Sequence, residues 1–178
     1  MIRVQQAVRQ RGFSRLELMT AVLVVGILAA ILLDRLYFYQ EMAEKARMEY
    51  TISRIKSGLR LRMAGMLVAG RAQEYFLLAR QNPMEWLDHK PENYVGERDS
   101  LDEQQARLGT WHFDRANNML VYLVQHGEHF QQQDSNGRKQ VRLKVVTIRN
   151  VNDGARESAS HDPSDSVAIA LVEPYQWF

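Results

Sequence analysis

The chain of 178 residues contains no cysteine, and this absence removes several functions at once. A thiol nucleophile, a disulfide framework and every cysteine-based metal site are excluded together. The sequence also contains no glycine-rich phosphate-binding loop, no HExxH and no CxxC, so the common signatures of nucleotide-dependent and metal-dependent enzymes are missing. We therefore predict a protein that is not an enzyme, with no catalytic residue, no cofactor and no bound metal.

The chain also lacks an excess of positive charge outside its first residues. Arg3, Arg9 and Arg11 fall among the first twelve residues, and without those twelve Lys+Arg drops from 23 to 20 against 21 Asp+Glu, a net charge of −1. Nucleic-acid binding needs a basic face, so the composition argues against it. Local positive charge occurs on one predicted strand, where solvent-exposed positions commonly carry it. Its residues are Lys139, Arg142, Lys144 and Arg149.

One long apolar run is present near the amino terminus. Residues 18–33 (LMTAVLVVGILAAILL) carry no charge and a single polar side chain, that of Thr20. A helix over residues 13–33 would be about 30 Å long, which matches the hydrocarbon core of a bilayer. The alternative is a secretory signal cut near Ala29-Ala30, but the run is longer than a typical signal core. The sequence favours a retained membrane helix, and the preceding arginines place the amino terminus in the cytoplasm.

A single carboxylate lies inside this apolar segment. Glu17 comes five residues after Gly12, and a carboxylate at the bilayer centre costs roughly 2.5–3.5 kcal/mol on insertion scales. Two interpretations stay open. Glu17 is only about 6 Å of helix rise beyond Phe13 and could reach the lipid headgroups, or it meets an opposite charge within the membrane. Arg15 does not decide between them, because residues two apart on a helix point to different sides.

Residues 10–19 (QRGFSRLELM) resemble the processing signal of type IV pilins and of type II secretion pseudopilins. In that family a short basic leader ends in glycine, the mature chain starts with phenylalanine and its fifth residue is glutamate. Gly12, Phe13 and Glu17 stand in these places, and residues 25–30 (VGILAA) are similar to the apolar run that follows. The match covers about 25 residues, in which leader length, junction, glutamate position and apolar run coincide in order.

This resemblance implies a processing and assembly route. A prepilin peptidase would cut between Gly12 and Phe13, and the new amine of Phe13 would be methylated. Glu17 would then neutralise the ammonium of a neighbouring subunit, because each charge is costly in lipid alone and tolerable as a pair. The implied partners are the peptidase, other pilin or pseudopilin subunits and an inner-membrane assembly platform. The chain would span the inner membrane once, with a periplasmic carboxyl-terminal domain, before entering a filament.

Two residues depart from the family pattern. Arg15 occupies a position that is normally apolar or threonine, and Asp34 stands where major pilins often carry a helix-bending proline. Both indicate a minor or specialised subunit, and the sequence does not distinguish a type IV pilus from type II secretion. Two rival hypotheses remain. One is a periplasmic enzyme or receptor tethered by residues 1–33, and the other is a secreted protein that loses about its first thirty residues.

The predicted helix continues beyond the membrane. Residues 34–68 contain no proline, and the spacing of Glu41 and Lys45 is typical of an exposed helix face. Apolar residues recur at steps of three and four, which predicts one stripe that packs on a sheet. The stripe consists of Met48, Ile52, Ile55, Leu59, Met63 and Met66.

The remaining sequence predicts a small head domain of the α+β class. A second apolar-periodic stretch covers residues 72–79 and stops at Asn82-Pro83, and a loop with one short helix follows, held by Trp86 and Tyr94. Alternating residues then indicate about four antiparallel strands, around residues 111–114, 119–124, 141–145 and 167–171. The resemblance implies the same pilin-like architecture.

The predicted parts of the whole chain are a cleaved leader (1–12), a transmembrane half-helix (13–33), an exposed half-helix (34–70) and a globular head (71–178). Within the head, a helix and loop (71–108) precede the sheet (109–178).

Three polar or aromatic groups in the head are candidate sites. The turn His126-Gly127-Glu128-His129 could supply metal ligands but is more typical of a solvated polar corner. A loop with Asp153, Asp162 and Asp165 falls where major pseudopilins bind calcium, although the spacing is not a ligand pattern. The final residues 175–178 (YQWF) are expected to pack on the domain, with a partner contact as the alternative.

Overall fold

A computed structural model describes residues 14–99, 107–132, 137–148 and 166–178 of the chain. The chain divides into two compact units, Met1–Tyr39 and Gln40–Phe178. Helix α1 (Arg15–Val68, 54 residues) contributes to both units. The predicted cleavage residues Gly12 and Phe13 and the loop of residues 151–165, where calcium was the open question, lie outside the described residues.

Helix α1 begins and ends where local sequence signals place its termini. At the start, the hydroxyl of Ser14 accepts a 3.2 Å hydrogen bond from the backbone N–H of Glu17, as a residue that caps a helix does. At the end, Gly70 has φ +70°, a conformation that favours glycine. Arg71 N–H bonds Met66 O at 2.8 Å and Gly70 N–H bonds Leu67 O at 3.0 Å, the paired bonds of a Schellman motif.

The second half of α1 carries the head domain on its apolar stripe. Met48, Ile55 and Leu59 are buried, and Ile52, Met63 and Met66 pack partly buried against the same core. The stripe predicted from the sequence is therefore confirmed. The predicted exposed position of Glu41 is wrong, because Glu41 is buried on this face. Lys45 instead lies 3.9 Å from Glu49, in an ion pair of the same four-residue spacing.

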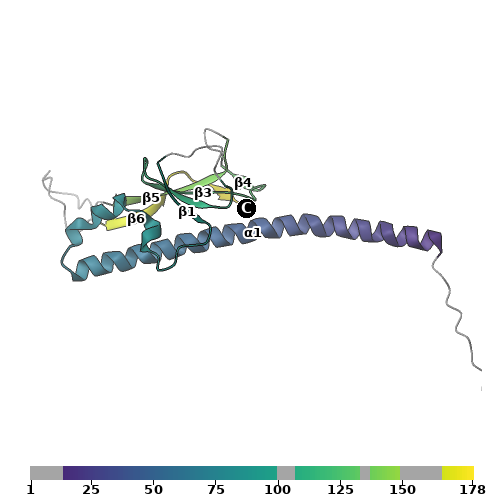
Figure 1. Cartoon of the computed structure of the whole chain (residues 1–178), viewed down its shortest axis with the longest axis horizontal. Helices are drawn as coiled ribbons and strands as arrows, with labels where there is room; N and C mark the ends of the chain where they lie inside the picture. The colour runs from purple at the N-terminus through teal and green to yellow at the C-terminus, as the bar shows by residue number, and fades with distance from the viewer. Residues whose placement is uncertain (1–13, 100–106, 133–136, 149–165) are drawn as a thin grey trace, which may run out of the picture. The chain divides into compact units, whose positions relative to one another are not determined.

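A mixed five-stranded sheet packs over this part of the helix (Figure 1). Its order is β1-β2-β3-β5-β6, with β1 parallel to β2 and the other pairs antiparallel. The strands are β1 (Tyr94–Arg98), β2 (Trp111–Asp114), β3 (Met119–Leu123), β5 (Gln140–Ile148) and β6 (Ser166–Leu171). A second sheet pairs β4 (Phe130–Gln131) with β7 (Gln176–Trp177).

The α+β class is thus confirmed, and four of the strands fall where alternation predicted them. The predicted count of about four, all antiparallel, was too low. It missed β1, whose sequence YVGER places two apolar residues side by side before a glycine, so that no apolar–polar alternation marks it although its burial alternates. It also missed β4 and β7, because a two-residue strand is too short to leave a period in the sequence.

The connection between helix and sheet contains two short 3-10 helices. Helix η1 (Ala72–Arg80) packs against β5 and β6, and η2 (Pro83–Trp86) follows it. Asn82 caps η2, since its side-chain oxygen accepts a 3.0 Å hydrogen bond from Met84 N–H. Trp86 is buried, and Tyr94 packs partly buried on the core. Both residues thus hold this connection to the domain, as the sequence predicted.

Candidate functional site

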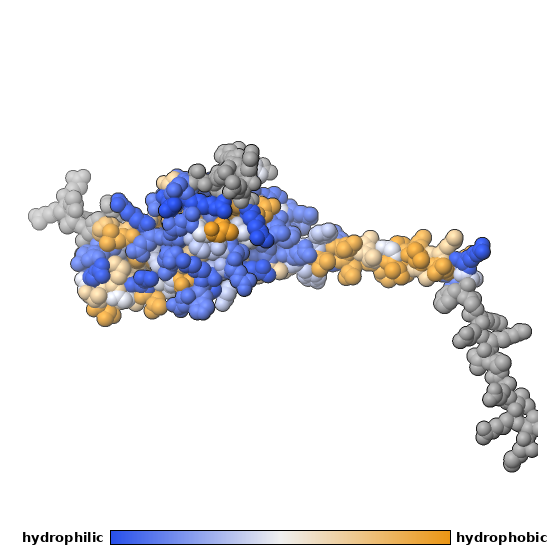
Figure 2. Space-filling model, viewed as in Figure 1, coloured by the Kyte–Doolittle hydropathy of each residue, from blue (hydrophilic) through white to orange (hydrophobic). Residues whose placement is uncertain are grey.

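The amino-terminal part of α1 presents an apolar surface along its whole length. Among the described residues α1 is long and apolar enough to cross a membrane, and no residue in its most apolar window is buried within the chain. Figure 2 shows these apolar side chains gathered on the helix, whereas the surface of the second unit in that view is mainly hydrophilic. An exposed apolar surface of this extent marks contact with lipid or with other protein.

Glu17 is the single acidic residue in the first turn of this helix. Two local features make an anion tolerable there. The backbone N–H groups at a helix start favour negative charge, and Ser14 and Glu17 have the spacing of a capping box. Among the described residues no ion pair reaches the Glu17 carboxylate, so any countercharge must come from elsewhere. Arg15, the other charged residue of this turn, is exposed.

A second, buried group of charges fastens the head to α1. Glu41 is 2% exposed, and its carboxylate accepts three hydrogen bonds. His129 donates from its backbone N–H at 2.9 Å and from ring Nδ1 at 2.8 Å, and the indole Nε1 of Trp177 donates at 2.9 Å. Because an ionised carboxylate only accepts, Nδ1 of His129 carries the hydrogen in this bond. One side chain of the helix thereby holds a turn and the carboxyl terminus.

Glu44 binds the start of the same turn. It is 8% exposed and accepts from Tyr122 Oη at 2.9 Å and from the backbone N–H groups of Gln125 and His126, both at 2.7 Å. Ring Nδ1 of His126 adds a contact of 2.9 Å. The hydrogen-bond partners of both buried carboxylates are donor groups, as their acceptor oxygens require. The charge also affects Tyr122, because burial and then the neighbouring Glu44 raise the pKa of its phenol.

Two opposing effects set the pKa of Glu41. Burial raises the pKa, but the hydrogen bonds from His129 and Trp177 outweigh burial and leave the pKa below its ordinary value. The carboxylate is therefore a stable anion inside the domain rather than a proton donor. This is the behaviour of a structural anchor and not of a general acid.

The sequence predicts a solvated polar corner at residues 126–129. Glu128 and His129 are exposed and His126 is half-buried, but the turn is also bound to the helix. Its histidines turn their Nδ1 atoms toward Glu44 and Glu41, and Lys139 Nζ donates to Gly127 O. Among the described residues no group of three or more histidine, aspartate or glutamate side chains is placed to hold a metal ion.

The final residues of the chain pack on the domain, as the sequence predicted. Trp177 is buried, and its carbonyl accepts a 2.6 Å hydrogen bond from Lys45 Nζ. The Phe178 ring lies 5.2 Å from the His129 ring and 5.6 Å from Lys45 Nζ. The carboxyl terminus therefore belongs to the same group of contacts as Glu41.

Comparison with protein-family models, with curated proteins and with solved structures finds no match to this chain. Geometry and chemistry therefore carry the functional argument.

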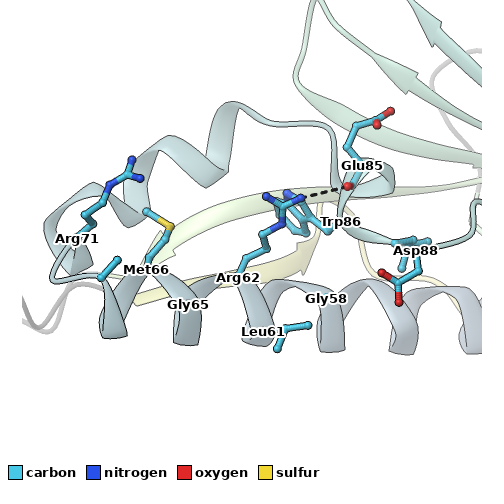
Figure 3. A pocket seen from close by; sticks show the side chains of 11 residues that line it. Gly58, Leu61, Arg62, Gly65, Met66, Arg71, Glu85, Trp86 and Asp88 are labelled. Carbon is cyan, nitrogen blue, oxygen red and sulfur yellow. Dashed lines mark hydrogen bonds between the residues drawn. The ribbon is translucent and has the colours of Figure 1, made fainter.

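A cleft of about 400 Å³ lies between the end of α1 and the segment after η2 (Figure 3). Arg62 reaches across it to the carbonyl of Glu85 at 3.5 Å, and the Glu85 carboxylate pairs with Lys90 at 2.6 Å. Arg71, at the rim, is bound to Glu74 at 2.6 Å. Most of the charged groups that line the cleft are thus bonded to other residues of the chain. They do not converge on a common point as catalytic groups would.

The sequence contains a signal for the burial of both glutamates, in their spacing from the apolar stripe. Glu41, Met48 and Ile55 are spaced by seven residues, and Glu44 is four residues before Met48. Residues at these spacings share one helix face, so both acids fall on the predicted apolar stripe. A carboxylate on a buried face needs donors, and those donors come from residues 122–129 and 177.

Proposed function

We propose that this chain is a structural subunit of a bacterial envelope filament, a minor pilin or pseudopilin that serves a type IV pilus or type II secretion. It is held in the inner membrane by its amino-terminal helix before assembly and performs no catalysis. One observation carries the proposal: an apolar helix surface, exposed throughout, begins with a single carboxylate and directly follows a Gly12-Phe13 junction.

The energetics of this surface require an apolar environment, which lipid and the helices of other subunits both provide. Burial of each large aliphatic side chain is worth about 1.5–3 kcal/mol, and Leu16, Val22 and Leu32 are all more than 60% exposed. Lipid covers such side chains before assembly, and helices of other subunits cover them afterwards. A tether for a soluble domain would need the same apolar length, but in a tether Glu17 would act only as a residue of the helix start.

The proposed partner of Glu17 is the amino-terminal ammonium of Phe13 on a neighbouring subunit. Cleavage after Gly12 by a prepilin peptidase creates this charge, and methylation of the amine leaves it positive. Two opposite charges that meet in an apolar environment neutralise each other, whereas each alone is costly there. The pair favours one register between adjacent subunits, so Glu17 acts in assembly.

Substitution of Glu17 tests this role. We expect Glu17→Ala to leave cleavage intact and to lower incorporation into filaments at least about tenfold, the equivalent of about 1.4 kcal/mol per contact. Thr20→Ala is the matched control, because the Thr20 hydroxyl bonds only Leu16 O of its own helix at 3.0 Å. Gly12→Glu should instead block processing. Normal incorporation of the Glu17→Ala subunit would remove the assembly role.

A further inference from the structure

One carboxylate connects three separate parts of the head domain. Oε1 of Glu41, on α1, accepts hydrogen bonds from both His129 N–H and Trp177 Nε1, each at 2.9 Å. The turn and the carboxyl terminus therefore share a single acceptor atom on the helix. Loss of its charge weakens both attachments at once.

The turn and the carboxyl terminus also form one piece of structure. Strand β4 pairs with β7, which sets Phe130 opposite Trp177. The Phe130 ring stacks on Tyr175 at 5.5 Å and meets Trp177 edge to face at 5.2 Å. This small sheet is separate from the five-stranded sheet. We define residues 126–131 and 175–178 as the latch segment.

We propose that Glu41 is the release point of a latch: when its carboxylate is neutralised, the latch segment leaves α1 as a unit while the five-stranded sheet stays folded. The inference concerns the head alone and does not depend on the filament proposal. One part of a domain can open at a lower free energy than the whole domain unfolds.

The chemistry of the carboxylate gives the direction of the pH effect. His129 and Trp177 lower the pKa of Glu41 from its ordinary value of 4.5, against the opposing effect of burial. The stabilisation is therefore complete above pH 4.5 and is lost as the pH falls through the lowered value. The neutral acid also carries a hydroxyl hydrogen, and the groups that face it are donors. A buried donor without an acceptor is unfavourable.

Other charged groups face the latch from every element around it. Lys45 holds the Trp177 carbonyl at 2.6 Å. The remaining groups are Glu44, Arg47 and Glu49 on α1, Tyr122 on β3, Lys139 before β5, and His126, Glu128 and His129 in the latch segment. Glu41 differs from these groups because it alone contacts both parts of the latch segment through its carboxylate.

The three tryptophans allow a direct test on the full-length chain in detergent micelles. With 5-fluorotryptophan incorporated, ¹⁹F NMR reports Trp177 in the latch, Trp111 in the sheet and Trp86 after η2 separately, each assigned by a Trp→Phe variant. In Glu41→Gln at pH 7 we expect complete loss of the native Trp177 resonance, with those of Trp111 and Trp86 unchanged. Glu92→Gln, at an exposed position between η2 and β1, should change none of them.

An acid titration of the unsubstituted chain provides the second readout and needs no variant that could fail to fold. We expect the native Trp177 signal to be lost as the pH falls below 4.5 while the Trp111 signal remains. The proposal is overturned if Glu41→Gln folds and keeps the native Trp177 resonance. Simultaneous loss of the Trp177 and Trp111 signals in the titration would equally overturn it, because the latch would then have no independent opening.

Discussion

The indole Nε1 of Trp177 lies 2.9 Å from Oε1 of Glu41, a hydrogen bond that joins residues 136 positions apart. It brings the penultimate residue of the chain against the helix that carries the head. The bond runs from a neutral donor to a buried anion, the kind that contributes most among side-chain hydrogen bonds. It therefore makes the carboxyl terminus a structural part of the domain.

Removal of the Trp177 donor should cost more than removal of a comparable indole elsewhere. Trp86 is also buried, but its Nε1 donates to the neutral side chain of Gln81 at 3.2 Å. Because a hydrogen bond to a charged group is worth about 1.5–3 kcal/mol and a neutral one about 1, Trp177→Phe should lower the free energy of unfolding by about 0.5–2 kcal/mol more than Trp86→Phe. Denaturant unfolding of the full-length chain in micelles measures the difference. Equal losses would show that Glu41 contributes nothing specific.

Glu44 and Tyr122 should be energetically coupled. The Tyr122 hydroxyl donates to Glu44 Oε1 in a buried position, so Tyr122→Phe and Glu44→Gln each disturb the same bond. A double-mutant cycle should give a coupling energy of about 1–2 kcal/mol. Tyr50→Phe is the control, since the side chain of Tyr50 is exposed and its loss should change stability by less than about 0.5 kcal/mol. Additive effects of the two substitutions would contradict the contact.

Two glycine substitutions should have effects of opposite sign. A Cβ at Gly127 would lie 2.8 Å from Val124 Cγ1 and 3.0 Å from Lys139 Cδ, so Gly127→Ala should destabilise the domain by about 1–3 kcal/mol. A Cβ at Gly65 meets nothing within 4 Å, and alanine in a helix is favoured over glycine by up to about 1 kcal/mol. Thermal unfolding of both variants tests the prediction, which fails if Gly127→Ala is as stable as the unsubstituted chain.

His112 should make the domain sensitive to mild acid. The residue is 2% exposed, and burial, with a smaller effect of Arg98, lowers the pKa of its imidazole from 6.5 to about 4. The unfolded chain therefore binds the proton first, and stability falls as the pH decreases from 6.5 to about 4, by at most about 3 kcal/mol. His112→Phe should flatten this part of the stability curve.

The control for this pH dependence is His89→Gln, at an exposed position, which should leave the curve unchanged. Unfolding in denaturant at a series of pH values measures both variants. An unaltered slope between pH 6.5 and 4 in His112→Phe would contradict the assignment to this residue.

Periodic features of the head were predictable from the sequence, and contacts between distant segments were not. The stripe from Met48 to Met66 follows from helical spacing, and β2, β3, β5 and β6 follow from alternation, because both patterns are local. The burial of Glu41 depends on donors from His129 and Trp177, which lie 88 and 136 positions away. No local pattern reports such donors, so the spacing of Glu41 and Lys45 alone predicts an exposed helix face.

The amino-terminal prediction has a different status. The apolar helix and the place of Glu17 in its first turn agree with the expectation of a membrane-spanning segment. Cleavage after Gly12, methylation of Phe13 and the assembly role of Glu17 stay predictions, since they concern events between this chain and other proteins.

The intact mass and amino-terminal sequence of the protein, isolated from the membranes or filaments of its own host, test the central claim most directly. The account predicts a chain that starts at Phe13 with a methylated amine and has lost residues 1–12. A product that retains Met1 and all twelve residues, or one that starts near Leu32, would contradict it.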